Sequence, residues 1–271
     1  MKNVYVFKAN IYKYFLTLHR AYPRSFFIGS LFTIFYTLLY SHILYNNIFD
    51  GQVDNDFIYR TGTSNYMGYI LVGILVYSFT VSTLLNVSRS LITEKRLGTL
   101  ESVMLAPYNR GFYFLAYMVA QTIHTFCELI FAIPILLIFG VKFPYFHLGS
   151  FIIVLLISLF AFLGLSLLLA NIMLYTRDTY ISQNTLFTIM FLICGINFPI
   201  EYLPSIVAKI SYFIPVTHSV KLFRSILLRG SSISIEANSI WALLIQGVIY
   251  TTIGLMTMKK VEKIALENIE G

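Results

Sequence analysis

Six long apolar stretches dominate the sequence, and they restrict the fold more than any other feature. Each is about 20 residues or longer, the length of an α-helix that crosses the hydrocarbon core of a bilayer. Five contain no Asp, Glu, Lys or Arg, and the third contains only Glu128. Charged residues make up 11% of the chain, against about 25% in soluble domains. We predict an all-α integral membrane protein of one domain, residues 1–271, with spans at about 26–45, 66–88, 112–139, 148–174, 180–198 and 240–258.

The Lys and Arg residues are distributed unevenly between these spans. With the N-terminus inside, the inner segments hold 13 of the 19 basic residues and the outer segments hold six. Cytoplasmic loops carry the excess of Lys and Arg, so both termini are predicted to be cytoplasmic, in the cell membrane. The net charge of +7 does not indicate nucleic-acid binding, because no basic cluster is present. The six outer basic residues are Arg60, Lys142, Lys209, Lys221, Arg224 and Arg229.

The first 25 residues mix apolar and basic side chains at helical spacing. We expect residues 1–25 to form an amphipathic helix on the inner leaflet, with Lys8 and Lys13 directed toward lipid headgroups. A soluble cytosolic helix is the alternative. Pro23 would mark the turn into the first span. The apolar face of this helix would consist of Phe7, Ile11, Tyr14, Phe15 and Leu18.

The predicted outer segment 199–239 is too polar to span a membrane and too apolar to be an ordinary loop. Half-helices that dip into the outer leaflet would fit this composition, since irregular backbone at membrane depth must be buried in protein or line a cavity. The basic residues of this re-entrant segment would extend to the membrane interface. Its prolines are Pro199, Pro204 and Pro215.

The segment between the second and third spans is short and charged, and it reads TEKRLGTLESVMLAP. Gly98 can end a helix that continues from the second span, and Thr99 is a suitable N-cap. Pro107 would stop a new helix over about 99–106. Such a short helix is marginal in water unless it docks on another surface. That surface could be the chain's own N-terminal helix or a partner protein. Its apolar edge would consist of Leu100, Val103 and Met104.

His124 and Glu128 lie four residues apart in the third span, so they share one face of the helix. An ionisable residue inside a membrane should face the bundle or a water-filled path. Two interpretations remain open at this stage. The pair could form a translocation or gating group, or Glu128 could be protonated and hydrogen-bonded to His124 or a neighbouring helix.

No enzyme motif is present in the sequence, whether a P-loop, H-E-x-x-H, G-x-S-x-G or a Cys/His cluster. We therefore expect no catalytic residue, metal site or cofactor in this chain. A stand-alone membrane protein, such as a proton-coupled carrier that uses His124 and Glu128, is the alternative from another functional class.

Two stretches resemble a known family. The first, EKRLGTLESVMLAPYNR, is similar to the E-x-x-x-G-T-x-E-x-L-x-x-x-P segment of the permeases of type-two ABC exporters. The second, CGINFPIEYLPSIVAKISYFIPVTHSVKLFRSILLRG, is similar to the last third of the same permeases. The resemblance covers the whole chain. Val103 is a departure, because the family usually has Leu at this position.

This resemblance implies that the segment near 93–107 is a coupling helix, which docks into a separate ATP-binding subunit. ATP and Mg would be bound by that partner and not by this chain. Two permease copies, expected to form a homodimer, and two ATP-binding subunits would make the transporter. The ATPase-coupling residues would be Glu94, Arg96, Gly98, Thr99, Leu100, Glu101, Met104 and Pro107.

The function implied is ATP-driven export of an amphipathic drug, antibiotic or lipid-like substrate. Export of a polysaccharide or teichoic acid is the alternative within the family. Spans 1–5 would occupy 26–198, span 6 would occupy 240–258, and 259–271 would be a cytosolic tail. The candidates for the translocation path or gate are His124, Glu128, Asn197, Phe198, Pro199, Pro204 and Pro215.

Overall fold

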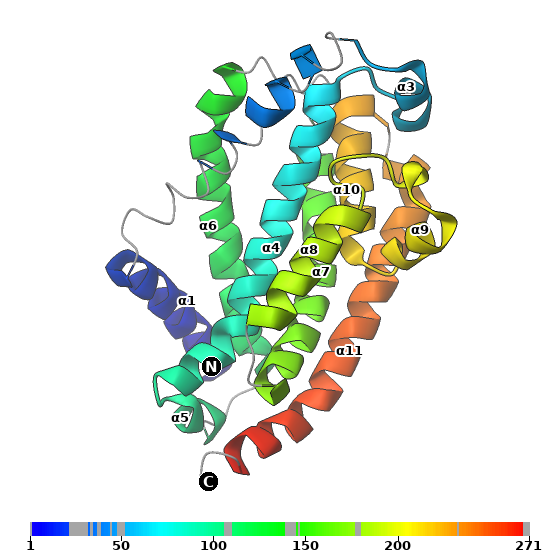
Figure 1. Cartoon of the computed structure of the whole chain (residues 1–271). Helices are drawn as coiled ribbons and strands as arrows, with labels where there is room; N and C mark the ends of the chain where they lie inside the picture. The colour runs from blue at the N-terminus through cyan, green and yellow to red at the C-terminus, as the bar shows by residue number, and fades with distance from the viewer. Residues whose placement is uncertain are drawn as a thin grey trace.

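In the part of the chain that the computed structural model describes, every regular element is a helix and none is a strand (Figure 1). It describes residues 2–21, 32, 35–36, 39–43, 45–47, 52–105, 110–138, 145, 147–176, 180–231 and 233–267. Three short elements are 3-10 or π-helical turns: η1 (Ile200–Tyr202), η2 (Ser225–Arg229) and η3 (Ile233–Glu236). The α-helices are α1 (Lys2–Ala21), α3 (Asn55–Thr61), α4 (Tyr66–Arg96), α5 (Leu100–Leu105), α6 (Arg110–Ile138), α7 (Leu148–Thr176), α8 (Tyr180–Ile193), α9 (Ser205–Ser211), α10 (Pro215–Arg224) and α11 (Ala237–Glu267).

Within these described ranges, three helices are long and apolar enough to cross a membrane. They are Tyr66–Ser90, Leu148–Thr176 and Ala237–Met258, and they correspond to the second, fourth and sixth predicted spans. The helix α8 is shorter than the fifth predicted span, because it ends at Ile193 and the chain bends after it. The first predicted span lies largely outside the described residues. The count of six spans therefore stays a prediction.

The helix α7 forms the centre of the bundle and packs against α4 and α11. It has buried residues on all sides, among them Val154, Phe162 and Met173. A helix that is apolar all round needs neighbours or lipid on every face. The helix α10 lies against α4, α7 and α11, and α1 lies against α6. The long helices thus form one framework to which the shorter elements are attached.

A polar contact joins α7 to α11 inside this apolar framework. The side-chain amide of Asn171 donates to the backbone oxygen of Gly254 at 2.7 Å and to Oγ1 of Thr257 at 2.8 Å. Polar side chains commonly connect helices in this way within membranes. The Asn171 side chain thus joins α7 to α11.

The segment 199–239 is divided into short helices that begin at prolines. Pro199 and Pro204 precede η1 and α9, and Pro215 is the first residue of α10. Proline suits these positions, because its fixed φ matches a helix start and its missing N–H would have no partner within the helix. The short helices predicted here are confirmed, whereas their depth in the membrane stays a prediction.

The two ends of the bundle carry different elements (Figure 1). The helix α5, the first residues of α1 and the last turns of α11 lie at one end, whereas α3 lies at the opposite end. The beginning of α1 and the end of α11 thus share one end of the bundle, as the predicted cytoplasmic placement of both termini requires.

We predict that Asn171→Ala loosens the contact between α7 and α11. Hydrogen bonds between membrane helices contribute about 0.6 kcal/mol on average and about 1.7 kcal/mol at most. The free energy of unfolding, measured by titration with a denaturing detergent, should fall by an amount in this range. Asn184→Ala, at an exposed position of α8, is the control and should change it less. Equal losses in both variants would contradict the assignment.

Candidate functional site

A buried carboxylate lies at the end of the long helix α4, next to α5. Glu94 is 1% exposed, although it lies only two residues before the last residue of the helix. Burial of an isolated carboxylate is strongly unfavourable, so the surrounding groups must compensate its charge with an ion pair and hydrogen bonds. The contacts of Glu94 are therefore the first to consider at this end of the molecule.

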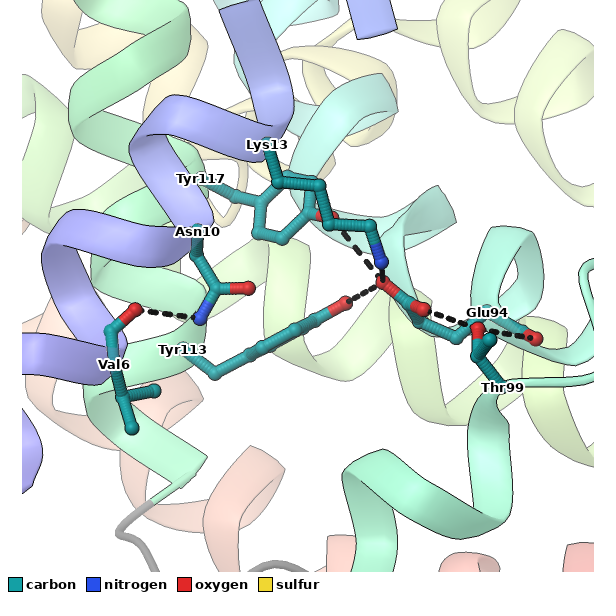
Figure 2. A network of polar contacts seen from close by, with 7 residues as sticks. All are labelled: Val6, Asn10, Lys13, Glu94, Thr99, Tyr113 and Tyr117. Atoms are coloured by element: carbon teal, nitrogen blue, oxygen red, sulfur yellow. Dashed lines mark hydrogen bonds and ion pairs between the residues drawn. The ribbon is translucent and has the colours of Figure 1, made fainter. Parts of the chain in front are cut away.

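Four side chains from three other parts of the chain converge on the Glu94 carboxylate (Figure 2). Lys13 of α1 forms an ion pair with it, with Nζ 2.5 Å from Oε1. The hydroxyl of Thr99 donates to Oε2 at 2.6 Å. Tyr113 and Tyr117 of α6 both donate to Oε1 at 3.4 Å. We call Lys13, Glu94, Thr99, Tyr113 and Tyr117 the Glu94 cluster. It joins α1, the end of α4, the start of α5 and α6 at one point.

The turn between α4 and α5 is built around the same residue. Gly98 has φ +69°, the left-handed conformation that glycine adopts without strain. The Thr99 N–H then donates to the backbone oxygen of Glu94 at 2.9 Å. The backbone oxygen of Thr99 accepts from the N–H of Val103 at 3.1 Å, so Thr99 occupies the N-cap position of α5. The short helix predicted over 99–106 is present as Leu100–Leu105.

The helix α5 has one edge inside the molecule and another in the open. Leu100 is buried and Val103 packs partly buried against the core. On the other side, Leu97 just before the helix is 61% exposed and Leu105 at its end is 81% exposed. The chain itself therefore covers one edge of α5. The other edge is exposed, where a partner protein could contact it. The side chains of Glu101 and Met104, and all of Pro107, lie outside the described residues.

The helix α1 is fixed to the bundle by a second polar contact, one residue after Lys13. The hydroxyl of Tyr14 donates to Oε1 of Gln121. Asn86 of α4 donates to the same oxygen at 2.6 Å, and the Gln121 amide donates to Thr125 at 3.1 Å. Gln121 thus links α1, α4 and α6.

The prediction that Lys13 points to lipid headgroups was wrong, because its ammonium group is held by the buried Glu94.

The other predicted path residues lie farther along the bundle. His124 is buried in α6, one residue before Thr125, whereas the side chain of Glu128 lies outside the described residues. Pairing between the two therefore stays a prediction. The residues that follow His124 in α6, Thr125 and Phe126, are among those that line an apolar crevice of about 60 Å3, which we define by its lining residues. These are Val72, Leu75, Val76, Phe79, Thr125, Phe126, Phe151, Leu155, Phe223 and Leu227.

Asn197, Phe198 and Pro199 follow α8 in a bend that Arg224 holds in place. The guanidinium of Arg224 donates to the backbone oxygens of Tyr69 at 3.1 Å, Gly195 at 2.5 Å and Ile196 at 2.6 Å. It also lies 3.4 Å from the centre of the Tyr69 ring. The prediction that the basic residues of 199–239 extend to the interface was wrong for Arg224, which is 8% exposed and bonded to three carbonyls.

Close approach at this point depends on Gly73 in α4. A Cβ atom there would lie 2.1 Å from the backbone oxygen of Ile196 and 2.6 Å from Nη2 of Arg224. Only glycine leaves room for both groups. The bend after α8 and the helix α10 are thus attached to α4 together.

Comparison with known proteins identifies the family. A profile described as ABC-2 type transporter matches residues 5–228, from α1 through η2. The chain belongs to the ABC-2 type transporter family. This confirms the resemblance found in the two sequence stretches, and it assigns the chain to the membrane-spanning permeases of ABC transporters. Export and dependence on ATP fit this family.

Two curated relatives are similar over 184 residues at 22% identity. Both are named Probable multidrug ABC transporter permease YbhR, one from Escherichia coli (strain K12) and one from Escherichia coli O157:H7. The match covers 67% of this chain and 49% of each relative. The chain therefore spans about half the length of the curated relatives it matches. Membership of this permease family suggests a transporter subunit and not an enzyme.

We predict that Lys13 and Glu94 are energetically coupled. In a double-mutant cycle with Lys13→Met and Glu94→Gln, the coupling free energy should be about 1 kcal/mol, near the upper limit for exposed pairs, because Glu94 is buried while Lys13 is 40% exposed. The measurement is the free energy of unfolding of the four proteins in detergent. Lys8→Met, at an exposed position of the same helix, should show no coupling to Glu94→Gln. A coupling of zero for Lys13 would contradict the ion pair.

Proposed function

We propose that this chain is the membrane-spanning subunit of an ATP-driven exporter, in which movement of a separate ATPase subunit reaches the membrane through α5. The observation that carries the proposal is the Glu94 cluster, which attaches the start of α5 to three longer helices. A short helix fixed at one end, with an exposed apolar edge, suits the transfer of force between two proteins.

The exposed edge at α5 would be the contact with the ATPase subunit. Leu97 and Leu105 present large apolar side chains to solvent at this end of the bundle. Burial of one such leucine in a partner groove contributes about 1.5–3 kcal/mol. Arg96, also exposed, lies close enough in sequence to take part in the same contact. Glu101, Met104 and Pro107 complete the set of coupling residues that we propose.

Force on α5 would be transmitted through the Glu94 cluster. Thr99, the N-cap residue of α5, connects this helix to the carboxylate, Lys13 connects the carboxylate to α1, and Tyr113 connects it to α6. These elements would move together when the ATPase subunits close, and the access of the path would change between the two sides of the membrane. Two ATPase subunits, which bind ATP and Mg, would act on two permease copies in the cell membrane.

For the cargo we favour an amphipathic drug, antibiotic or lipid-like molecule over a polysaccharide or teichoic acid. The apolar crevice supports this choice, because its lining consists of aliphatic and aromatic side chains with Thr125 as the polar group. The curated name of the YbhR relatives, multidrug transporter permease, points the same way. His124 directly precedes Thr125 of this lining in α6 and is proposed as a path residue, together with Glu128 and the gate residues of 197–215.

We predict that Leu105→Glu weakens binding of the ATPase subunit about tenfold to hundredfold, because a charge replaces an apolar side chain that the partner buries. The measurement is the dissociation constant of the detergent-purified permease with each ATP-binding subunit encoded in the same genome.

Tyr59→Glu is the control, since it adds the same charge at an exposed position of α3, at the end of the bundle opposite α5 (Figure 1). Its affinity should stay within about twofold of the unmodified chain, well below 1 kcal/mol. If no ATP-binding subunit binds the unmodified chain, the proposed function is wrong. If both variants bind as tightly as the unmodified chain, the contact lies elsewhere on the permease.

A further inference from the structure

A second hollow, which we call the basic cavity, lies near the start of α4. It has a volume of about 90 Å3 and contains the side chain of Tyr69 in its wall. Tyr69 is in the first turn of α4, whereas α5 follows the last turn of the same helix, so the basic cavity is far from the Glu94 cluster. Its charged lining residues are Arg60, Glu201, Lys221, Arg224 and Arg229.

The concentration of positive charge at this cavity is unusual for its place in the chain. Of the six basic residues in the predicted outer segments, four line this one hollow. Loops on that side of a membrane are normally poor in Lys and Arg. Insertion of the chain therefore gives no reason for these four residues to gather, and a binding role would give one.

Carboxylates hold three of these cations, Arg60, Arg229 and Lys221, from positions outside the lining. Oδ2 of Asp56 accepts from Nε of Arg60 at 2.8 Å within α3. This hydrogen bond from the Arg60 guanidinium lowers the pKa of Asp56, so the pair stays ionised near neutral pH. Glu236, buried at the end of η3, accepts from Arg229 at 2.9 Å. Such pairs fix the direction of long side chains, which reduces the entropy lost when a ligand binds.

Lys221 completes the arrangement, with its Nζ 3.1 Å from Oε2 of the same Glu236. The lining itself contains four cations and one carboxylate, Glu201. Asp56 and Glu236 lie behind it, and four cations against three carboxylates leave one net positive charge. Arg224 is additionally fixed by three backbone carbonyls, so this part of the wall is rigid.

Neighbouring residues of α4 and α10 line the apolar crevice and the basic cavity. On α4, Tyr69 lines the basic cavity and Val72, one helical turn later, lines the crevice. On α10, Arg224 lines the basic cavity and Phe223 lines the crevice. A molecule with a compact anionic group and an apolar tail would find complementary surfaces within one helical turn.

We propose that the basic cavity binds a phosphate group, carried either by an amphipathic molecule such as a phospholipid or by a small soluble phosphate. Arg and Lys side chains are the usual partners of phosphate oxygens, and Arg can donate to two of them at once. The volume suits a compact anion and excludes a sugar polymer. This inference goes beyond the exporter function, and it requires neither ATP nor the ATPase subunit.

The test uses the full chain, purified in an uncharged detergent, and inorganic pyrophosphate as the soluble probe. Calorimetry should detect binding that weakens as sodium chloride is raised, since salt screens the attraction. Lys221→Gln should weaken binding about fivefold, as expected for the loss of about 1 kcal/mol of charge attraction. This variant leaves the Arg229–Glu236 pair in place, and its melting temperature checks that it is folded. Arg60→Gln, in a different helix, should weaken binding to a similar extent.

The matched control is Lys209→Gln, because Lys209 is an exposed lysine of α9 that does not line the basic cavity. It removes the same charge and should leave the affinity unchanged. Two results would count against the site: no binding of pyrophosphate, or a loss of affinity in Lys209→Gln as large as that in Lys221→Gln. Either result disproves the site, except where the experiment with lipids described next shows binding that depends on Lys221.

The lipid arm distinguishes the two sources of the phosphate. The chain in nanodiscs of phosphatidylcholine is compared with the chain in nanodiscs that contain phosphatidylglycerol, and the rise in melting temperature is measured. A rise that Lys221→Gln and Arg60→Gln reduce, but Lys209→Gln does not, supports a lipid phosphate. Binding of pyrophosphate without such a rise supports a small soluble phosphate. No response that depends on Lys221 in either arm overturns the proposal.

Discussion

The burial of one carboxylate at the end of α4 determines how this end of the molecule is built. Glu94 is 1% exposed, so its charge must be compensated within the protein. The compensating groups come from α1, α6 and the turn into α5, which are thereby held together (Figure 2). Removal of one partner would leave a buried charge, which is energetically unfavourable. This free-energy cost keeps the groups of the Glu94 cluster together as a unit. We infer that the same unit receives the movement of the ATPase subunit.

The sequence predicted the parts of this unit that depend on local chemistry. Gly98 and Thr99 could be assigned to a helix end and an N-cap because such roles depend on neighbouring residues. The partner of Glu94 could not be predicted in the same way. Lys13 is 81 positions earlier in the sequence, and only the packing of α1 against α6 brings it near. As a basic residue on an amphipathic helix, it was assigned to lipid headgroups, which is the usual place for such a residue.

The opposite end shows the same division between local and distant information. The prolines of 199–239 indicated helix starts, and short helices begin there. The burial of Arg224 was not foreseen, because it depends on carbonyls of Tyr69, Gly195 and Ile196 that no local pattern brings together. Through its three carbonyl partners, Arg224 holds the bend after α8 against α4. The basic cavity and the apolar crevice both border this fixed point.

The central claim is that α1 and α5 move as one body when ATP binds. The direct measurement is the distance between spin labels at Lys8 and Ser102, and between labels at Ser102 and Lys209, in the permease–ATPase complex with and without trapped ATP. The account predicts an unchanged distance from Lys8 to Ser102 and a changed distance from Ser102 to Lys209. A change between Lys8 and Ser102 as large as that between Ser102 and Lys209 would contradict it.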